Sequence, residues 1–143
     1  MRKSELMTLW NVESWTVEPH GVYFVSRRLG TNRLENVGQA FQKLNISCTD
    51  YTEAEVLSLP MWEQLYIQLD KLDQLAQEII QKEMPPDEPV VLILTDIMLD
   101  TSGCYGAFAL GYDMGESTAG QLYVLVSFDK NFTARQDVIY ETL

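Results

Sequence analysis

The chain is poor in the residues that hold disulfide-rich domains together and that build zinc sites. Its 143 residues include two cysteines, Cys48 and Cys104, and one histidine, His20. Two thiols are too few for a disulfide framework, which favours a reducing compartment. Two cysteines and one histidine cannot complete a four-ligand zinc site without a carboxylate. A chain of this length buries enough surface to fold without either aid, and we expect no metal and no cofactor.

Long hydrophobic runs are also missing. The longest run, at residues 90–94, is far shorter than the ~20 residues that span a bilayer. Arg2 and Lys3 precede a stretch that Glu5 and Glu13 interrupt, so the pattern of a signal peptide does not follow them. We therefore expect a cytoplasmic protein with no membrane partner.

Positive charge is scarce. The chain has 10 Lys and Arg against 21 Asp and Glu, a net charge of −11 at pH 7. Because phosphate binding needs Lys and Arg at the contact face, a nucleic-acid ligand is not expected. The charge is uneven, with six basic and four acidic residues at positions 1–47 and four basic and seventeen acidic residues at positions 48–143. This favours a basic partner and predicts that the C-terminal part forms the negative face of the molecule.

Motifs of nucleophilic catalysis and phosphate binding are absent from the sequence. There is no Gly-x-Ser-x-Gly elbow, no Walker lysine and no Gly-x-Gly-x-x-Gly loop. A catalytic Cys104 would need a base, and His20 is remote in sequence, in a Pro-His-Gly turn. We interpret Cys104 as a small buried residue of a strand and expect no catalytic role for either side chain.

The N-terminal part predicts a hairpin and then a helix. Residues 21–29 are rich in β-branched and aromatic side chains and predict a strand, which residues 8–17 pair with across a turn at residues 18–21. Apolar residues with helical spacing predict the first helix from Thr31 to Leu44. Thr52-x-x-Glu55 is a capping box and predicts a second, short helix.

A long amphipathic helix is the strongest element that the sequence predicts. It begins at Pro60 and extends to Ile80, with an apolar stripe of period near 3.6. Five residues of that stripe are predicted to be core: Trp62, Leu65, Leu69, Leu72 and Ile79. Leu75 also falls on the stripe, whereas the polar face, which includes Asp73 and Gln77, is interpreted as solvated.

The remainder predicts a β-meander. The proline-rich residues 84–89 end the helix, and residues 90–95, 104–110 and 122–128 read as antiparallel strands, with residues 138–140 as a last strand. Residues 113–120 are predicted to form a connecting loop. The expected fold is α+β, an antiparallel sheet with a long amphipathic helix and one or two shorter helices packed on one face, in a single domain spanning residues 1–143.

One segment carries a family resemblance. Residues 109–124 (ALGYDMGESTAGQLYV) and 127–132 (SFDKNF), about a quarter of the chain with the residues around them, resemble the C-terminal segment of small bacterial immunity proteins of polymorphic and contact-dependent toxin systems. The resemblance implies a cytoplasmic protein that binds and neutralises a toxin domain without catalysing a reaction. It carries over no catalytic residues.

The acids in and beside the predicted loop are the candidate site. Asp113, Glu116 and Asp129 are expected to bind the basic partner, with Tyr112 as an aromatic anchor. The loop acids Asp113 and Glu116 could also supply oxygen ligands for Ca²⁺ or Mg²⁺ together with Asp96, Asp100 and Asp129, but the spacing does not fit a twelve-residue calcium loop.

Two other functions stay open. One is a small enzyme or ligand-binding domain with a pocket between the long helix and the sheet, which would use Tyr112, Asp113 and Cys104. The other is a scaffold that dimerises through an exposed sheet edge. A gene for a large secreted protein next to this one would favour the immunity function, and a metabolic operon would favour the enzyme.

Overall fold

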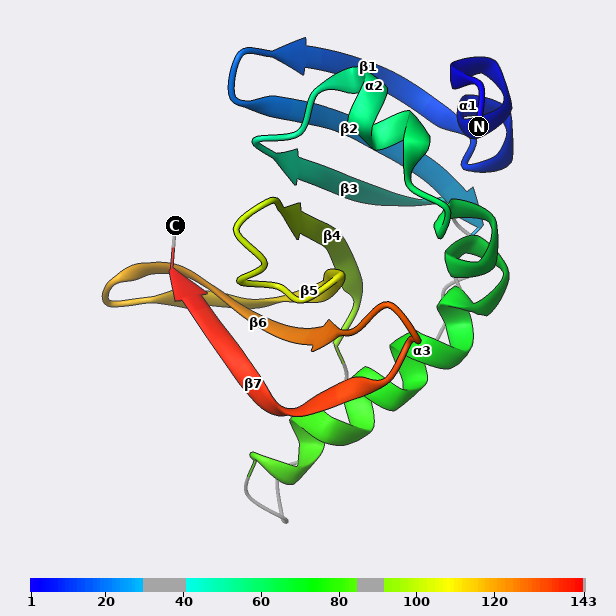
Figure 1. Cartoon of the computed structure of the whole chain (residues 1–143). Helices are drawn as coiled ribbons and strands as arrows, with labels where there is room; N and C mark the ends of the chain where they lie inside the picture. The colour runs from blue at the N-terminus through cyan, green and yellow to red at the C-terminus, as the bar shows by residue number, and fades with distance from the viewer. Residues whose placement is uncertain (30–40, 85–91, 143) are drawn as a thin grey trace.

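The computed structural model describes residues 1–29, 41–84 and 92–142, and its main feature is a single seven-stranded sheet with the strands in sequence order (Figure 1). The strands are β1 (Val12–Glu18), β2 (Gly21–Leu29), β3 (Phe41–Thr49), β4 (Leu94–Asp100), β5 (Phe108–Ser117), β6 (Gly120–Phe128) and β7 (Ala134–Thr142). The helices are α1 (Lys3–Leu9), α2 (Glu53–Ser58) and α3 (Trp62–Lys82).

The sheet consists of two antiparallel meanders joined by one parallel pair. Strands β1 to β3 form the first meander, β4 to β7 form the second, and β3 pairs in parallel with β4 from Asn45↔Asp96 to Thr49↔Asp100. The pair is parallel because α2 and α3 carry the chain back before β4 starts, which a tight turn cannot do. The α+β expectation therefore holds in outline, but the sheet is mixed and larger than predicted.

Helix α3 supplies much of the core. The five residues predicted to be buried on it are at most 3% exposed: Trp62, Leu65, Leu69, Leu72 and Ile79. Leu6 of α1 and Val56 of α2 join the same core, so all three described helices contribute to it. The helix begins at Trp62 rather than at Pro60, which precedes the N-cap residue Met61.

Two assignments on α3 were wrong. Leu75, placed on the buried stripe, is 37% exposed. Asp73, placed on the solvated face, is only 9% exposed, because the Tyr112 hydroxyl donates to its Oδ1 atom over 2.5 Å and Gln77 Nε2 donates to the same atom over 3.0 Å. Buried carboxylates need such donors.

The N-terminal hairpin and the capping box are confirmed, with one helix missed. Strand β2 has the predicted bounds, but β1 starts at Val12 because Lys3–Leu9 is the helix α1. At α2, Thr52 Oγ1 accepts from the Glu55 amide over 3.2 Å, and Glu55 Oε1 accepts from the Thr52 amide over 3.0 Å.

The predicted helix from Thr31 to Leu44 is wrong where the structure describes it. Its first ten residues lie outside the described part of the chain, but Phe41–Thr49 forms strand β3. Leu44, Ile46 and Cys48 are buried in alternation and pair with β2, so the two-residue period and the ladder prevail over the helical spacing.

The strands of the second meander are displaced from their predicted bounds. Strand β4 is Leu94–Asp100 rather than residues 90–95, of which 90 and 91 are not described. Residues 101–107 form turns, so β5 starts at Phe108 and not at Cys104. The predicted loop at residues 113–120 is wrong for most of its length, since β5 continues to Ser117 and only residues 118–119 turn the chain into β6. A register shift between Asp113 and Gly115 lets the ladder accommodate the glycine.

Candidate functional site

The structure places two of the four predicted partner-binding residues together and the other two elsewhere. Asp113 and Glu116 lie on the exposed part of the β5–β6 hairpin, where they pair with Tyr123 and Gln121 of β6. Tyr112 is 0% exposed. Asp129 follows the other end of β6, roughly 20 Å along the strand from the position opposite Asp113. The hairpin acids are therefore together, and the other two residues are elsewhere.

Tyr112 lies in the core. Its hydroxyl donates to Asp73 of α3, at 2.5 Å from Oδ1. A buried tyrosine normally has such a partner for its hydroxyl. With no exposed surface, the side chain is not available to anchor a protein at the surface, and its structural role is to tie β5 to α3.

Asp129 is exposed but engaged in its own turn. Its Oδ1 atom accepts from the Asn131 amide over 2.8 Å and from the Thr133 amide over 3.0 Å. This geometry is the local turn chemistry that favours Asp after a strand. The carboxylate thus shapes the β6–β7 connection.

The sheet brings a different set of side chains together on the face turned away from α3. Tyr112 and its partner Val124 are fully buried on the α3 side, so strand alternation places the next pair, Asp113 and Tyr123, on the opposite side. Tyr123 in turn pairs with Glu141 of β7. We call the four residues on this face of β4 to β7 the acidic surface: Asp96, Asp113, Tyr123 and Glu141.

Asp96 is a half-buried carboxylate of the acidic surface. It faces Gly111 of β5, where an added Cβ would lie 3.1 Å from the Asp96 Cβ, so glycine leaves room for the acid. Thr95 Oγ1 donates to its Oδ2 atom over 2.7 Å. Burial raises the pKa of Asp96, the Thr95 hydrogen bond opposes this shift, and the charge of Asp113 adds to it.

Tyr123 lies within electrostatic reach of both carboxylates. Burial raises the pKa of its hydroxyl, and the charges of Asp113 and Asp96 raise it further. Asp113 lies opposite Tyr123, and Asp96 lies opposite Gly111, two residues before Asp113, so the three residues are neighbours on one face of the sheet. An aromatic ring beside two carboxylates suits an ammonium or guanidinium group, through charge-assisted hydrogen bonds and cation–π contact.

An open pocket of about 420 Å³ adjoins Asp113. Leu92, Ile93, Thr95 and Gly115 line it together with Asp113. Ile93 is 53% exposed, so the pocket offers an apolar wall beside a carboxylate. Such a surface suits the aliphatic stem and charged head of a lysine or arginine.

Glu141 is held at the other border of the acidic surface. The hydroxyl of Tyr105 donates to both of its carboxylate oxygens, over 2.7 and 3.0 Å. Burial, followed by the bond to Glu141 and its charge, raises the pKa of Tyr105. The turns of residues 101–107 are thereby fastened to β7.

Sequence reasoning chose Asp113 from turn chemistry and considered Asp96 only as a metal ligand. It missed Tyr123 and Glu141, because neither lies in a turn or a motif. The signal that could have found them is the strand period, which puts residues 123 and 125, and 139 and 141, on a shared face once the meander is known.

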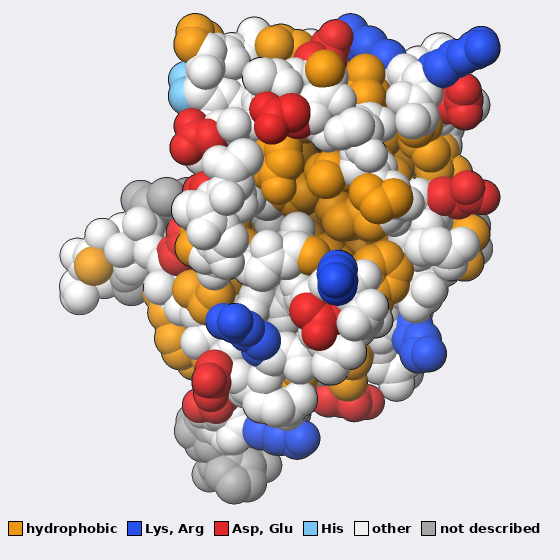
Figure 2. Space-filling model, viewed as in Figure 1, with side chains coloured by type: hydrophobic (Ala, Val, Ile, Leu, Met, Phe, Trp, Pro, Cys, Tyr) orange, Lys and Arg blue, Asp and Glu red, His pale blue; other side chains and the backbone are white. Residues whose placement is uncertain are grey.

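Figure 2 shows the charge pattern of one face of the molecule. Acidic and basic side chains are interspersed there, and hydrophobic side chains gather below α2. This mixture shows that the excess of acidic residues is not spread as one negative field over every face. The carboxylates that share strand positions on β4 to β7 are therefore the better candidate for recognition of a cation.

The thiols and the histidine do not come together as a motif would require. Cys48 is buried in β3, and burial raises its pKa to about 12, which makes it a poor nucleophile at neutral pH. Cys104 is exposed in the turns before β5, so its assignment to a buried strand was wrong. His20 lies in the β1–β2 turn, with Nε2 at 2.9 Å from Glu18 Oε2.

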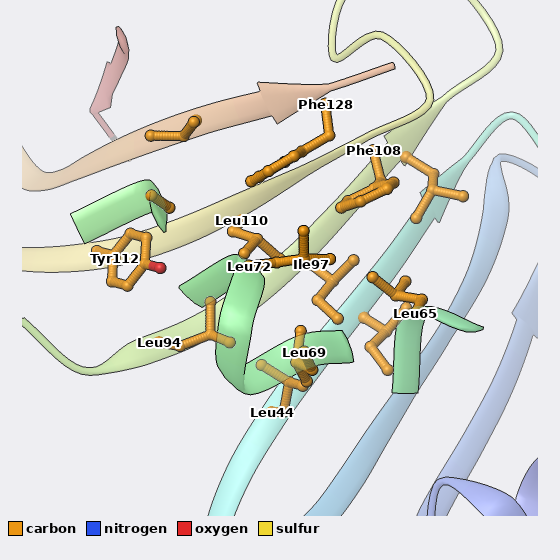
Figure 3. Packing of buried hydrophobic residues seen from close by; sticks show 14 of the residues in the cluster. Leu44, Leu65, Leu69, Leu72, Leu94, Ile97, Phe108, Leu110, Tyr112 and Phe128 are labelled. Atoms are coloured by element: carbon orange, nitrogen blue, oxygen red, sulfur yellow. The ribbon is translucent and has the colours of Figure 1, made fainter. Parts of the chain in front are cut away.

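The expected pocket between the long helix and the sheet is occupied by side chains. Leu65, Leu69 and Leu72 of α3 pack toward Ile97 of β4 and Leu110 of β5, and all five are at most 3% exposed (Figure 3). The residues proposed to line that pocket also separate, because Tyr112 is in the core, Asp113 is on the opposite face and Cys104 is in a turn.

Comparison and pattern searches add three negative findings. Residues 1–29, 41–84 and 92–142 contain no group of three or more His, Cys, Asp or Glu side chains placed to hold a metal ion. Nor does any helix in those ranges have the length and apolar character needed to cross a membrane. No protein-family model, curated protein or solved structure matches the chain.

Proposed function

We propose that this chain is a protein-binding module that recognises a basic protein through its acidic surface. We propose further that it acts as an immunity protein, neutralising a toxin domain by direct binding. The observation that carries the binding function is the placement of Asp96, Asp113 and Tyr123 at neighbouring positions on one face of the sheet, beside an open pocket with an apolar wall. The immunity function rests on the resemblance of residues 109–124.

The electrostatics of the site favour a cationic ligand. Burial is the main cause of the raised pKa of Asp96, and repulsion by the charge of Asp113 adds to it. A lysine or arginine between them would turn this repulsion into two attractions. The excess of acidic residues at positions 48–143 would also accelerate the encounter with a basic protein.

We propose Tyr123, in place of Tyr112, as the aromatic residue that anchors the partner. Tyrosine is enriched among the residues that dominate binding energies at protein interfaces. Tyr123 is partly exposed on the acidic surface, whereas Tyr112 is fully buried. We therefore expect Tyr123 to contact the partner and Asp113 and Glu116 to set the rate of approach.

The test is association kinetics with the basic toxin-type domain encoded beside the gene for this chain, at two ionic strengths. Substitution of Asp113→Asn with Glu116→Gln removes two negative charges from the hairpin, and we expect association to slow about tenfold at low salt and to depend less on salt. The matched control is Glu63→Gln with Glu78→Gln, which removes the same charge from exposed positions of α3. We expect the control to change the rate far less.

Two outcomes would contradict the proposal. Equal effects of the hairpin pair and the α3 pair would mean that only net charge matters and that the acidic surface is not the interface. Failure to bind any neighbouring basic domain would refute the immunity function. A small-molecule ligand at the pocket beside Asp113 would then become the leading explanation.

A further inference from the structure

Strand β7 is an edge of the sheet. Its nine residues pair with β6 on one side, and no strand in the described part of the chain pairs with the other side. The outward N–H and C=O groups of an edge strand are a template for another strand. The opposite edge is β1.

The two edges differ in their charges. The charged residues of β1 are Glu13 and Glu18, so two copies of β1 would bring only like charges together. The register is interrupted at both edges, between Val12 and Ser14 in β1 and opposite Val126 and Phe128 beside β7, so charge is what distinguishes the two edges. Strand β7 carries charges of both signs, which are Arg135, Asp137 and Glu141. Of the two edges, only β7 offers complementary charges to a second copy of itself.

We propose that β7 pairs antiparallel with β7 of a second copy of this chain, about a twofold axis at Val138. This register places Arg135 opposite Glu141 of the second copy, and Glu141 opposite Arg135. Residues directly opposite in an antiparallel pair lie on the same face, which an even separation such as that of positions 135 and 141 satisfies. The dimer therefore contains two cross-strand ion pairs, with Val138 packed on Val138 at its centre.

The side chains on β7 suit this arrangement. Arg135 is exposed, and no residue of the described chain forms an ion pair with it. Glu141 is oriented by the Tyr105 hydroxyl, and a carboxylate has further lone-pair sites for a guanidinium. Tyr140 is 50% exposed and would lie opposite Gln136 of the second copy, which covers part of its ring.

The register also brings like charges diagonally across the interface. Asp137 of each copy would lie diagonally across from Asp137 and from Glu141 of the other, at a distance of about 7–8 Å. These like-charge contacts weaken the dimer without preventing it, because two opposite-charge pairs lie directly across the interface. They supply a substitution that should strengthen the association.

The twofold axis is perpendicular to the sheet, so it keeps the two faces distinct. The helices α3 of both copies lie on one side of a continuous sheet, and both acidic surfaces lie on the other. The dimer thus places the two acidic surfaces side by side, with Glu141 of each copy paired to Arg135 of the other and with Asp96, Asp113 and Tyr123 left open to a partner. It goes beyond the proposed function and does not depend on the identity of a toxin.

The test is sedimentation equilibrium of the full chain over a wide concentration range. We expect a monomer–dimer equilibrium, with Arg135→Glu weakening dimerisation about tenfold or more, because it turns both ion pairs into repulsions. The double substitution Arg135→Glu with Glu141→Arg restores both pairs and should return dimerisation to the original strength. Asp137→Asn should strengthen dimerisation by about two- to fivefold.

Controls separate loss of pairing from loss of folding. Lys71→Glu makes the same charge change on an exposed position of α3 and should leave the dimer unchanged. Tyr105→Phe removes the hydrogen bonds that orient Glu141 without altering the sequence of β7. Circular dichroism reports whether each variant is folded. A wild-type chain that stays monomeric at millimolar concentration overturns the proposal. A dimer that Arg135→Glu leaves intact, or that the folded double variant fails to restore, overturns the β7 register.

Discussion

At the scale of single residues, the polar contacts between distant segments define the structure more than any motif does. Gln77 of α3 donates to Asp73 and also donates to the carbonyl oxygen of Leu92 over 2.8 Å, while its own oxygen accepts from the Leu92 amide over 3.4 Å. One side chain thereby fastens α3 to the segment that enters β4. These contacts could not be predicted from the sequence, because nothing local distinguishes Asp73 and Gln77 from the solvated residues beside them.

Asp96 predicts a specific pH dependence of stability. Its pKa is raised in the folded chain, first by burial, so the folded state binds a proton more readily than the unfolded state between the ordinary carboxyl pKa of 3.8 and the raised one. Stability therefore falls as pH rises through that window, and the full cost is present at neutral pH. We expect Asp96→Asn to raise the free energy of unfolding at pH 7 and to have a smaller effect near pH 4.

Urea denaturation at the two pH values measures this difference. The control is Glu116→Gln, which removes the same charge from the exposed part of the hairpin and should show no comparable gain at pH 7. A loss of stability in Asp96→Asn at pH 7 would mean that its charge is stabilised in the fold. The surroundings of Asp96, near Gly111 and Asp113, would then stabilise its charged form rather than destabilise it.

At the scale of elements, the burial pattern along helix α3 predicts how two substitutions on that helix differ in their effect on stability. Leu69 is 0% exposed, and Ile67, two residues earlier, is 64% exposed. We expect Leu69→Ala to lower the free energy of unfolding by ~2–5 kcal/mol, through lost transfer energy and the cavity that remains. Ile67→Ala on the same helix should change it by less than ~0.5 kcal/mol. Denaturant midpoints compare the two, and equal losses would mean that Ile67 is covered in solution.

The elements predicted correctly are those with strong local signals. The β-branched run of β2, the capping box of α2 and the apolar stripe of α3 each carry their own structural preference. Strand β3 was missed because Leu44 fits a helical stripe as well as a strand, and pairing with β2 and β4 decides between them. The extension of β5 was missed because Asp113 and Gly115 are turn residues that a register shift accommodates in a ladder.

The residues of the candidate site also divide into those that local sequence signals predict and those whose place depends on the tertiary fold. Asp113 and Glu116 could be chosen from the sequence because acids beside glycine predict an exposed hairpin. Tyr123 could not, since its place beside Asp96 depends on the order of three strands and on which face α3 covers. Tyr112 was wrongly placed at the surface, because its burial depends on contact with Asp73 of α3, which lies 39 residues earlier in the sequence.

At the scale of the whole molecule, one core joins the two meanders. Phe24 and Ile46 of the first meander belong to the same buried cluster as Ile97 and Leu110 of the second. Helix α3 contributes to this cluster through most of its length, from Trp62 to Ile80. The parallel pair β3–β4 and this shared core therefore both couple the stability of the two meanders.

The three tryptophans allow this coupling to be measured. Trp10 and Trp62 lie edge to face at 6.0 Å, and Trp15 stacks on Phe24 at 4.8 Å, so all three report on the end of the molecule that holds the first meander. Ile97 is on β4, in the second meander, and is 0% exposed. A substitution at Ile97 therefore perturbs one meander while the fluorescence is read from the other.

We expect Ile97→Ala to lower the free energy of unfolding by ~2–5 kcal/mol and to shift the transitions seen by tryptophan fluorescence and by far-ultraviolet circular dichroism to the same extent. The reason is that a single core cannot lose the packing of β4 without loosening the side chains that enclose Trp62. Ile93→Ala, at a position 53% exposed, is the matched control and should leave both midpoints within experimental error. Two separated transitions, with the fluorescence midpoint unmoved by Ile97→Ala, would show instead that the meanders unfold independently and that α3 does not couple them.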